Sequence, residues 1–213
     1  MKINKKLVFL IIVSIIGNII IYPFIPDKIP HRNLQMAVDG YSGKWTLFLM
    51  PLTTAGMYFL LFFLGKLDKR NELNIKTYDL LLTLCVLFFI LLNIWIVFYS
   101  LGYGLNIIRL LNLAMGVFFI ILGNYLPRIR TNSLFGIRTP WTLQNEQVWK
   151  NTHRLGGYVL IAAGLISFII SFFSSLIGII GFIAVTAMII LITCIFSYVN
   201  YTKLTDKNKF GGI

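Results

Sequence analysis

The hydrophobic positions of this chain fall in long, nearly unbroken blocks that are separated by shorter polar segments. A helix that crosses a hydrocarbon layer of about 30 Å needs about 20 residues, because each residue adds about 1.5 Å. The final apolar run of about 45 residues is too long for one crossing, so it must turn near Ser174 and Ser175 or near Gly178. The pattern predicts six membrane helices, over residues 7–22, 45–64, 79–99, 105–126, 155–174 and 178–199.

The predicted membrane helices carry few polar residues. Pro51 is expected to kink the second helix. Four asparagines are interpreted as hydrogen-bond partners between helices rather than as substrate ligands: Asn18, Asn93, Asn112 and Asn124. None of the seven acidic residues lies deep in a predicted helix. This disfavours a proton- or sodium-coupled transporter, because such carriers usually keep a carboxylate near the membrane midplane.

Composition and charge support a membrane protein and add an orientation. Of the 213 residues, 58% are hydrophobic and 12% are charged, whereas roughly a quarter of the residues of a soluble domain are charged. A net charge of +12 is also found in proteins that bind nucleic acid, but with the N-terminus inside, 15 of the 19 basic residues fall in cytoplasmic segments. We therefore predict an all-α, polytopic transmembrane helix bundle of about six spans, N-in and C-in, surrounded by the lipid bilayer and with no direct nucleic-acid partner.

The first long loop, over residues 23–44, is predicted to lie outside the cell. Its prolines include Pro26 and Pro30, which favour a stiff, extended chain, and the segment from Asp39 to Gly43 is interpreted as a turn. Asp27, His31 and Asp39 are suitable metal ligands by type, but their spacing matches no known site. The remaining alternatives are a surface that contacts an extracellular molecule and a purely structural connector.

The second long loop, over residues 127–154, is predicted to lie inside. Thr142 is interpreted as a helix N-cap after Pro140 and Trp141, and the helix is expected to run through His153 along the membrane interface. This helix is either a structural elbow or a binding surface for a cytoplasmic partner. The candidate residues for such a surface are Arg138, Thr139, Pro140, Trp141, Glu146, Trp149, His153 and Arg154.

The sequence shows no enzyme signature. The two histidines, His31 and His153, fall on opposite sides of the membrane in the predicted topology, so they cannot form a shared metal site or a general-base pair. The chain also lacks the HExxH, GxSxG and P-loop motifs. Cys85 and Cys194 both lie within apolar blocks and are interpreted as small buried side chains. We predict no enzyme activity and no cofactor.

The inner loop resembles the signature of the SdpI-like membrane proteins. The matching residues are Gly136-Ile-Arg-Thr-Pro-Trp-Thr142, then Glu146, Val148-Trp149 and Thr152-His-Arg-Leu-Gly-Gly157. The proline-rich outer loop is similar to the domain of unknown function (DUF1648) that often precedes this signature. The resemblance implies two regions: residues 1–70 with two spans and the outer loop, and residues 71–213 with four spans and the inner loop.

The resemblance also implies a function. It indicates a multi-pass protein of the bacterial plasma membrane that gives immunity to a secreted peptide toxin and signals by holding a small transcriptional repressor at the membrane. Under this hypothesis the inner-loop candidates face the repressor or lock the loop, and the outer-loop candidates, Pro26, Asp27, Pro30, His31 and Asp39, shape the face that meets the toxin. A small transporter or exporter of peptide or lipid is the alternative, and an unrecognised membrane enzyme is a third.

Overall fold

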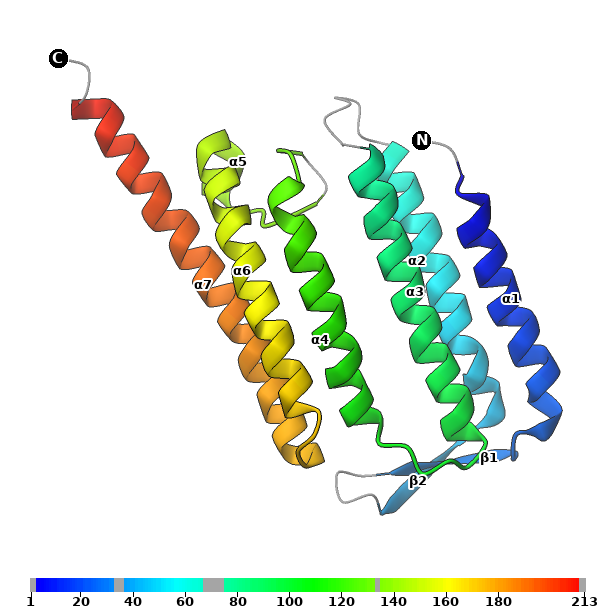
Figure 1. Ribbon diagram of the computed structural model, residues 1–213. Helices are drawn as coiled ribbons and strands as arrows, with labels where there is room; N and C mark the ends of the chain where they lie inside the picture. Colours follow the sequence, from blue (N-terminus) through cyan, green and yellow to red (C-terminus); the bar gives the residue numbers. More distant parts are fainter. Residues whose placement is uncertain (1–2, 33–36, 67–74, 133–134, 211–213) are drawn as a thin grey trace.

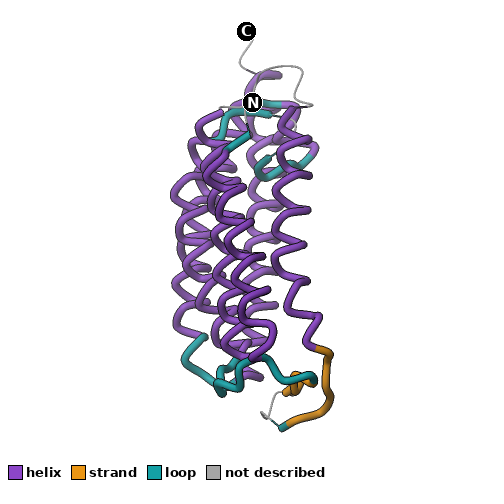
Figure 2. The backbone as a smooth tube through the Cα atoms, turned by 90° about the vertical axis from the view of Figure 1, so that its right-hand side faces the viewer, coloured by secondary structure: helices purple, strands orange, loops and turns teal. Residues whose placement is uncertain are grey.

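The fold comes from a computed structural model that describes residues 3–32, 37–66, 75–132 and 135–210. Six long helices lie side by side (Figures 1 and 2), and all six are long and apolar enough to cross a membrane. They are α1 (Lys5–Ile21), α2 (Leu49–Lys66), α3 (Ile75–Ser100), α4 (Ile107–Tyr125), α6 (Glu146–Ile170) and α7 (Ser175–Phe210). The shorter elements are η1 (Tyr22–Phe24), β1 (Lys28–Arg32), β2 (Val38–Gly43), η2 (Lys44–Phe48), η3 (Leu126–Arg128) and α5 (Pro140–Gln144).

The predicted polytopic helix bundle and its six spans are confirmed. The start of α1, the end of α7 and the short helix α5 lie at one end of the bundle, and the strands β1 and β2 lie at the other (Figure 1). The last apolar run turns over residues 171–174, close to the predicted Ser174 and Ser175. The two long loops are therefore at opposite ends of the molecule, although which end faces the cytoplasm stays a prediction.

The bundle is inside-out compared with a soluble protein. Large apolar side chains such as Phe9, Ile183 and Leu191 are exposed on its outer surface, where lipid would cover them. Several polar side chains, including Asn93 and Ser197, are buried between helices.

The helices form two groups. Helices α1, α2 and α3 pack on one another, and helices α4, α6 and α7 pack on one another. The predicted boundary near residue 70 does not follow from this grouping and stays a prediction.

Glycines bring α4 and α6 into backbone contact. A Cβ added to Gly116 would lie 2.8 Å from the carbonyl oxygen of Gly164, and a Cβ on Gly123 would lie 2.7 Å from that of Gly157. Each pair of glycines is seven residues apart on its helix, so both lie on one face. Any larger residue at these positions would separate the two helices, which makes α4 and α6 the tightest helix pair of the C-terminal group.

An asparagine pair joins the N-terminal helices. Asn18 of α1 and Asn93 of α3 each donate a hydrogen bond to the side-chain oxygen of the other at 3.1 Å. Asn18 also donates to the carbonyl oxygen of Leu47 at 2.8 Å. That carbonyl is four residues before Pro51, which has no N–H to offer it. The predicted interhelical role is confirmed for Asn18, Asn93 and, through the carbonyl of Gly178, Asn112, while Asn124 is exposed.

Three local predictions are wrong. Pro51 does not kink the interior of the second span, because it lies in the first turn of α2, where an amide has no helical partner to lose. The residues from Asp39 to Gly43 form strand β2 rather than a turn, since β1 provides a hydrogen-bonded neighbour for them. The fifth span begins at Glu146 rather than at residue 155, because the polar segment before it continues the same helix.

Candidate functional site

The strands β1 and β2 form an antiparallel hairpin over one end of the bundle, with Pro30 opposite Tyr41 and His31 opposite Gly40. Asp27 and Lys44 close its base with an ion pair of 2.6 Å. The hydrogen bond from Lys44, together with its charge, holds the pKa of the Asp27 carboxyl below its usual value. Tyr99 of α3 donates a hydrogen bond of 2.6 Å to the carbonyl oxygen of Pro30. The hairpin is therefore held against the end of α3.

A pocket of about 450 Å³ lies between this hairpin, the start of α2 and the end of α3, with the first residue of α4 at its edge. Three of the five outer-loop candidates line it: Pro30, His31 and Asp39. Ser100 also lines the pocket, is 1% exposed, and its hydroxyl has no hydrogen-bond partner. The other two candidates, Pro26 and Asp27, are exposed residues outside the lining. We refer to this space as the outer pocket.

At the opposite end, His153 and Trp149 hold the inner loop against α6. Both side chains are fully buried, and their rings stack with centroids 4.0 Å apart. Trp149 donates from Nε1 to the carbonyl oxygen of Ile129 at 2.9 Å. His153 accepts from the amide of Ile137 at Nε2, and its Nδ1 lies 2.9 Å from the carbonyl of Trp149. These bonds require a neutral ring that carries its proton on Nδ1.

Two threonines fix the start of the short helix α5 and attach it to α7. Thr139 is its N-cap and forms a reciprocal capping box with Thr142. The Thr139 hydroxyl also lies 3.1 Å from the hydroxyl of Ser197 in α7. Trp141 packs against Tyr198 with ring centroids 5.1 Å apart. Thr142 is therefore not the N-cap that the sequence predicts, because Thr139 is correctly placed one turn earlier.

The predicted interfacial helix through His153 is also wrong. The helix of Thr142 ends at Gln144, and Asn145 caps a new helix by accepting hydrogen bonds from the amides of Gln147 and Val148. This new helix is α6, which continues without a break into the membrane span. The break follows from the extended backbone of Asn145, since its side chain satisfies the free amides of a helix N-terminus.

The inner-loop candidates fall into two sets. Thr139, Trp149 and His153 are buried and hold the loop in place, and Trp141 is half-buried. The exposed members are Arg138, Pro140, Glu146 and Arg154. Glu146 pairs with Lys150 at 2.8 Å, so its carboxylate is partly neutralised. The surface available to a partner is therefore smaller than the sequence indicates.

A basic groove beside these residues was not singled out from the sequence. Its volume is about 690 Å³, and its lining includes Arg128, Arg130 and Lys150 together with the carboxylate of Glu146. Arg128 and Arg130 come from the segment after α4, while Lys150 comes from the first turns of α6. The sequence signal was the short spacing of the two arginines, but their position across from Lys150 depends on the packing of α4 on α6.

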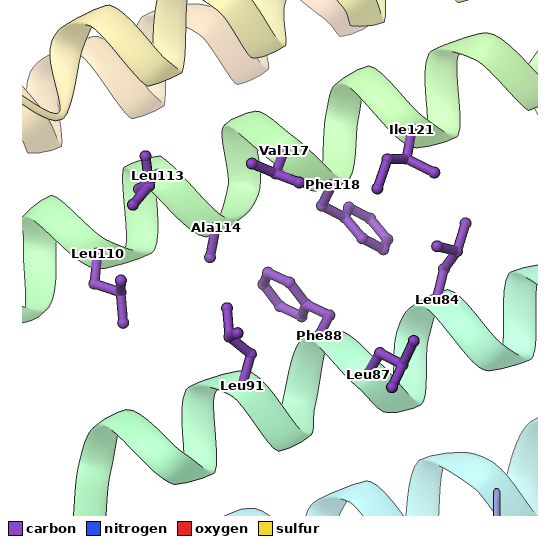
Figure 3. Close-up of a pocket in the computed structure, with 10 residues that line it drawn as sticks. All are labelled: Leu84, Leu87, Phe88, Leu91, Leu110, Leu113, Ala114, Val117, Phe118 and Ile121. Carbon is purple, nitrogen blue, oxygen red and sulfur yellow. The ribbon is translucent and has the colours of Figure 1, made fainter. Parts of the chain in front are cut away.

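The two groups of helices meet along α3 and α4. Between them lies a wholly apolar groove of about 320 Å³, shown in Figure 3. Leu84, Phe88 and Leu91 face it from α3, and Leu110, Ala114 and Phe118 face it from α4. At the end of the bundle that carries α5, Tyr78 of α3 contacts Phe135, with ring centroids 5.0 Å apart. Helix α3 thus touches both the outer pocket and the inner loop.

Comparison with known proteins gives matches over nearly the whole chain. Residues 128–199 match the model of the SdpI/YfhL protein family, and residues 9–55 match a domain of unknown function, DUF1648. The chain is 31% identical over 210 residues to "Immunity protein SdpI" of Bacillus subtilis (strain 168), covering 97% of this chain and 100% of that protein. No solved structure matches.

Proposed function

Because the chain belongs to the SdpI/YfhL protein family, a family of multi-pass bacterial membrane proteins, we propose that it gives its cell immunity to a secreted antimicrobial peptide. The observation that carries this proposal is the match to an immunity protein along its full length. It is supported by the resemblance of the signature from Gly136 to Gly157, which surrounds the buried residues Trp149 and His153. The protein would bind the peptide or change how it inserts into the membrane.

The toxin would meet the hairpin end of the bundle. The basic residues favour an orientation in which both termini are cytoplasmic, since cytoplasmic loops carry an excess of lysine and arginine. In this orientation the end with β1 and β2 (Figure 1) and the outer pocket between them and α3 would face the outside of the cell, and the end with α5 and the basic groove would face the inside.

The inner end would contact a small cytoplasmic repressor. The basic groove beside Arg128 and Arg130 suits an acidic segment of such a partner. A receptor signals only if its ligand favours one of two states. Helix α3 is suited to connect them, because Tyr99 touches the hairpin at one end and Tyr78 touches Phe135 of the inner loop at the other.

Deletion of the gene tests immunity. Cells that lack the protein are expected to become sensitive to a peptide toxin encoded beside it, and expression of the chain is expected to restore resistance. Unchanged sensitivity to every such peptide would contradict the proposal. Uptake of labelled peptide into vesicles that contain the purified protein would instead identify the transporter that the sequence left as an alternative.

Signalling is tested separately by variants of the inner end. The double change Arg128→Glu and Arg130→Glu reverses the charge of the groove, so recruitment of the repressor to the membrane should fall while protection remains. Lys203→Glu, at an exposed basic residue of α7 outside the groove lining, is the matched control. Loss of protection in step with recruitment would contradict a separate signalling surface.

The link through α3 is tested by a second variant. Phe135→Ala removes the ring contact with Tyr78, so addition of toxin should no longer change the amount of repressor at the membrane.

A further inference from the structure

The hairpin of β1 and β2 is attached to the first group of helices. Ile29 of β1 is buried in a cluster with Leu47 and with Val97 of α3. Tyr99, also of α3, donates its hydrogen bond to the carbonyl oxygen of Pro30. The hairpin therefore belongs with α1, α2 and α3, and we call these elements together the N-terminal unit.

The inner loop is attached to the second group of helices. Trp149 of α6 donates a hydrogen bond to the segment after α4, and the hydroxyl of Thr139 attaches α5 to Ser197 of α7. At the other end of this group, Asn106 donates to the hydroxyl of Ser175 at 2.8 Å and so joins the start of α4 to the start of α7. We call α4, α5, α6, α7 and the inner loop the C-terminal unit. A signal from the hairpin to the inner loop must cross from one unit to the other.

The two units meet where α3 packs on α4 (Figures 1 and 3), and apolar contact alone holds this seam. Between residues 78–100 of α3 and residues 107–125 of α4, all of them described, there is no hydrogen bond and no ion pair. Phe88 of α3 and Phe118 of α4 touch with ring centroids 5.1 Å apart. Within the units, by contrast, buried hydrogen bonds join α1 to α3, and glycine contacts join α4 to α6.

A bilayer makes an apolar seam weaker than it would be in water. Acyl chains are as apolar as leucine, so apolar contact between helices gains little, and close packing or hydrogen bonds must hold the helices together. The groove of about 320 Å³ along the seam shows that packing there is incomplete. Separation of α3 from α4 therefore costs less than separation of helices within a unit, so each unit can move as a rigid body.

The linker between α3 and α4, over residues 101–106, provides a pivot. The amides of residues 101–103 donate to carbonyl oxygens of α3, whereas Asn106 is the N-cap of α4. Only Gly104 and Leu105 lie between these two attached ends. A Cβ on Gly104 would meet nothing within 4 Å, so its backbone has room to absorb a rotation.

A pivot at this end of the bundle places the largest movement at the other end. Tyr78 lies about 33 Å along α3 from Ser100, so a rotation of about 10° would move it by about 6 Å. Tyr78 contacts Phe135, which packs against the cores of both units. Leu81 of α3 is also buried in the core of the C-terminal unit. A movement of this size would break both contacts.

We propose that the protein consists of two rigid units that rotate about the linker near Gly104, so that the α3–α4 seam opens and closes at the end that carries Phe135. Contact with Phe135 stabilises the closed state. The movement itself follows from the packing and does not depend on the proposed function. Its role in carrying a signal from the hairpin to the inner loop rests on that function.

The movement is tested with spin labels on the full chain in phosphatidylcholine nanodiscs. A ketone-bearing unnatural residue that carries the label replaces Lys66 of α2 and Gln147 of α6, two exposed positions in different units. Double electron–electron resonance should give a distance distribution about twice as wide as that of a pair inside one unit. The pairs inside one unit are Lys5 with Lys66 and Gln147 with Lys203, all at exposed positions.

A cross-link that locks the seam should remove the extra width. In a background with both native cysteines changed to alanine, Phe88→Cys and Phe118→Cys are joined by a short bifunctional thiol reagent in detergent before reconstitution. The matched control joins Trp141→Cys to Tyr198→Cys inside the C-terminal unit, where the ring centroids are also 5.1 Å apart. The first cross-link should narrow the distribution between units to the width found within a unit, and the control should leave it wide.

Phe135→Ala should widen the distribution between units further, because it removes the contact that stabilises the closed state. The pairs inside one unit report whether each variant is folded, since their distributions should not change. A distribution between units as narrow as those within them would overturn the proposal. So would a wide distribution that the cross-link between Phe88→Cys and Phe118→Cys leaves unchanged, or one that Phe135→Ala does not alter.

The outcome is separable from that of the proposed function, because the spin-label measurement uses no toxin and no repressor. If the distribution between units is narrow while the chain protects cells, the movable seam fails and immunity still stands. If the distribution is wide and the cross-link narrows it while deletion of the gene leaves sensitivity unchanged, the seam stands and the immunity function fails.

Discussion

His153 closes the inner loop through a contact that depends on the absence of a side chain. Gly136 has a φ of +108°, and a Cβ there would overlap Nε2 of His153, the atom that accepts from the amide of Ile137. The histidine was a candidate from its place in the inner loop, but its buried position could not be predicted. The glycine and the histidine are 17 residues apart, and only the packing of the loop on α6 brings them together.

The change Gly136→Ala should therefore destabilise the protein by about 3 kcal/mol or more, because steric overlap adds to backbone strain. The matched control is Gly102→Ala. Gly102 has a φ of +91° and open space around it, so it should lose only about 1–2 kcal/mol. The two variants are compared by heating each in detergent and measuring the fraction of protein that remains folded by size-exclusion chromatography. Equal losses would show that the contact with His153 is unimportant.

The ion pair of Asp27 and Lys44 predicts a titration outside the membrane. Because the pKa of Asp27 lies below its ordinary value of 3.8, the pair stabilises the hairpin above pH 3.8 and this contribution is lost as the pH falls through the lowered pKa. Lys44→Met should move the pKa of Asp27 back toward its ordinary value, as measured by carboxyl NMR. Lys28→Met, which removes a neighbouring charge and keeps the pair, should have a smaller effect.

At the scale of elements, the contact between α4 and α6 depends on four glycines. Their spacing of seven residues is visible in the sequence at Gly116 and Gly123 and again at Gly157 and Gly164. Spacing places each pair on one helix face. It does not say which helix the face meets, since α3 and α7 are also apolar and long enough to be neighbours.

Adding a methyl group to this contact should be costly. Gly116→Ala places a Cβ 2.8 Å from the Gly164 carbonyl oxygen, so we expect a loss of about 1–3 kcal/mol from overpacking. Gly56→Ala in α2 is the control, because nothing lies within 4 Å of its added Cβ. Steric-trap or thermal unfolding in detergent would measure both. An unchanged stability of Gly116→Ala would mean that α4 and α6 separate freely.

At the scale of the whole molecule, the two long loops lie at opposite ends of the bundle (Figure 1). With the predicted orientation, a cysteine at the exposed Tyr41 should react with a membrane-impermeant maleimide added to intact cells. A cysteine at the exposed Gln144 should react only after the cells are permeabilised. The opposite pattern would reverse the orientation, and labelling of both from outside would contradict a bundle of six crossings.

The sequence alone determined the number of membrane helices, the two long loops and an interhelical role for Asn18 and Asn93, although not that these two side chains pair with each other. The length of an apolar segment, and the presence of a polar side chain within it, are properties of that segment alone, so the sequence of the segment is enough to predict a membrane helix and a residue that needs a hydrogen-bond partner. Only the tertiary structure decided which helices touch, that Trp149 and His153 are buried, and that Ser100 lies in a pocket with Asp39. In a bilayer every helix is apolar on its outer face, so hydrophobicity cannot select the partner of a helix. That choice depends on close packing and on hydrogen bonds between distant residues.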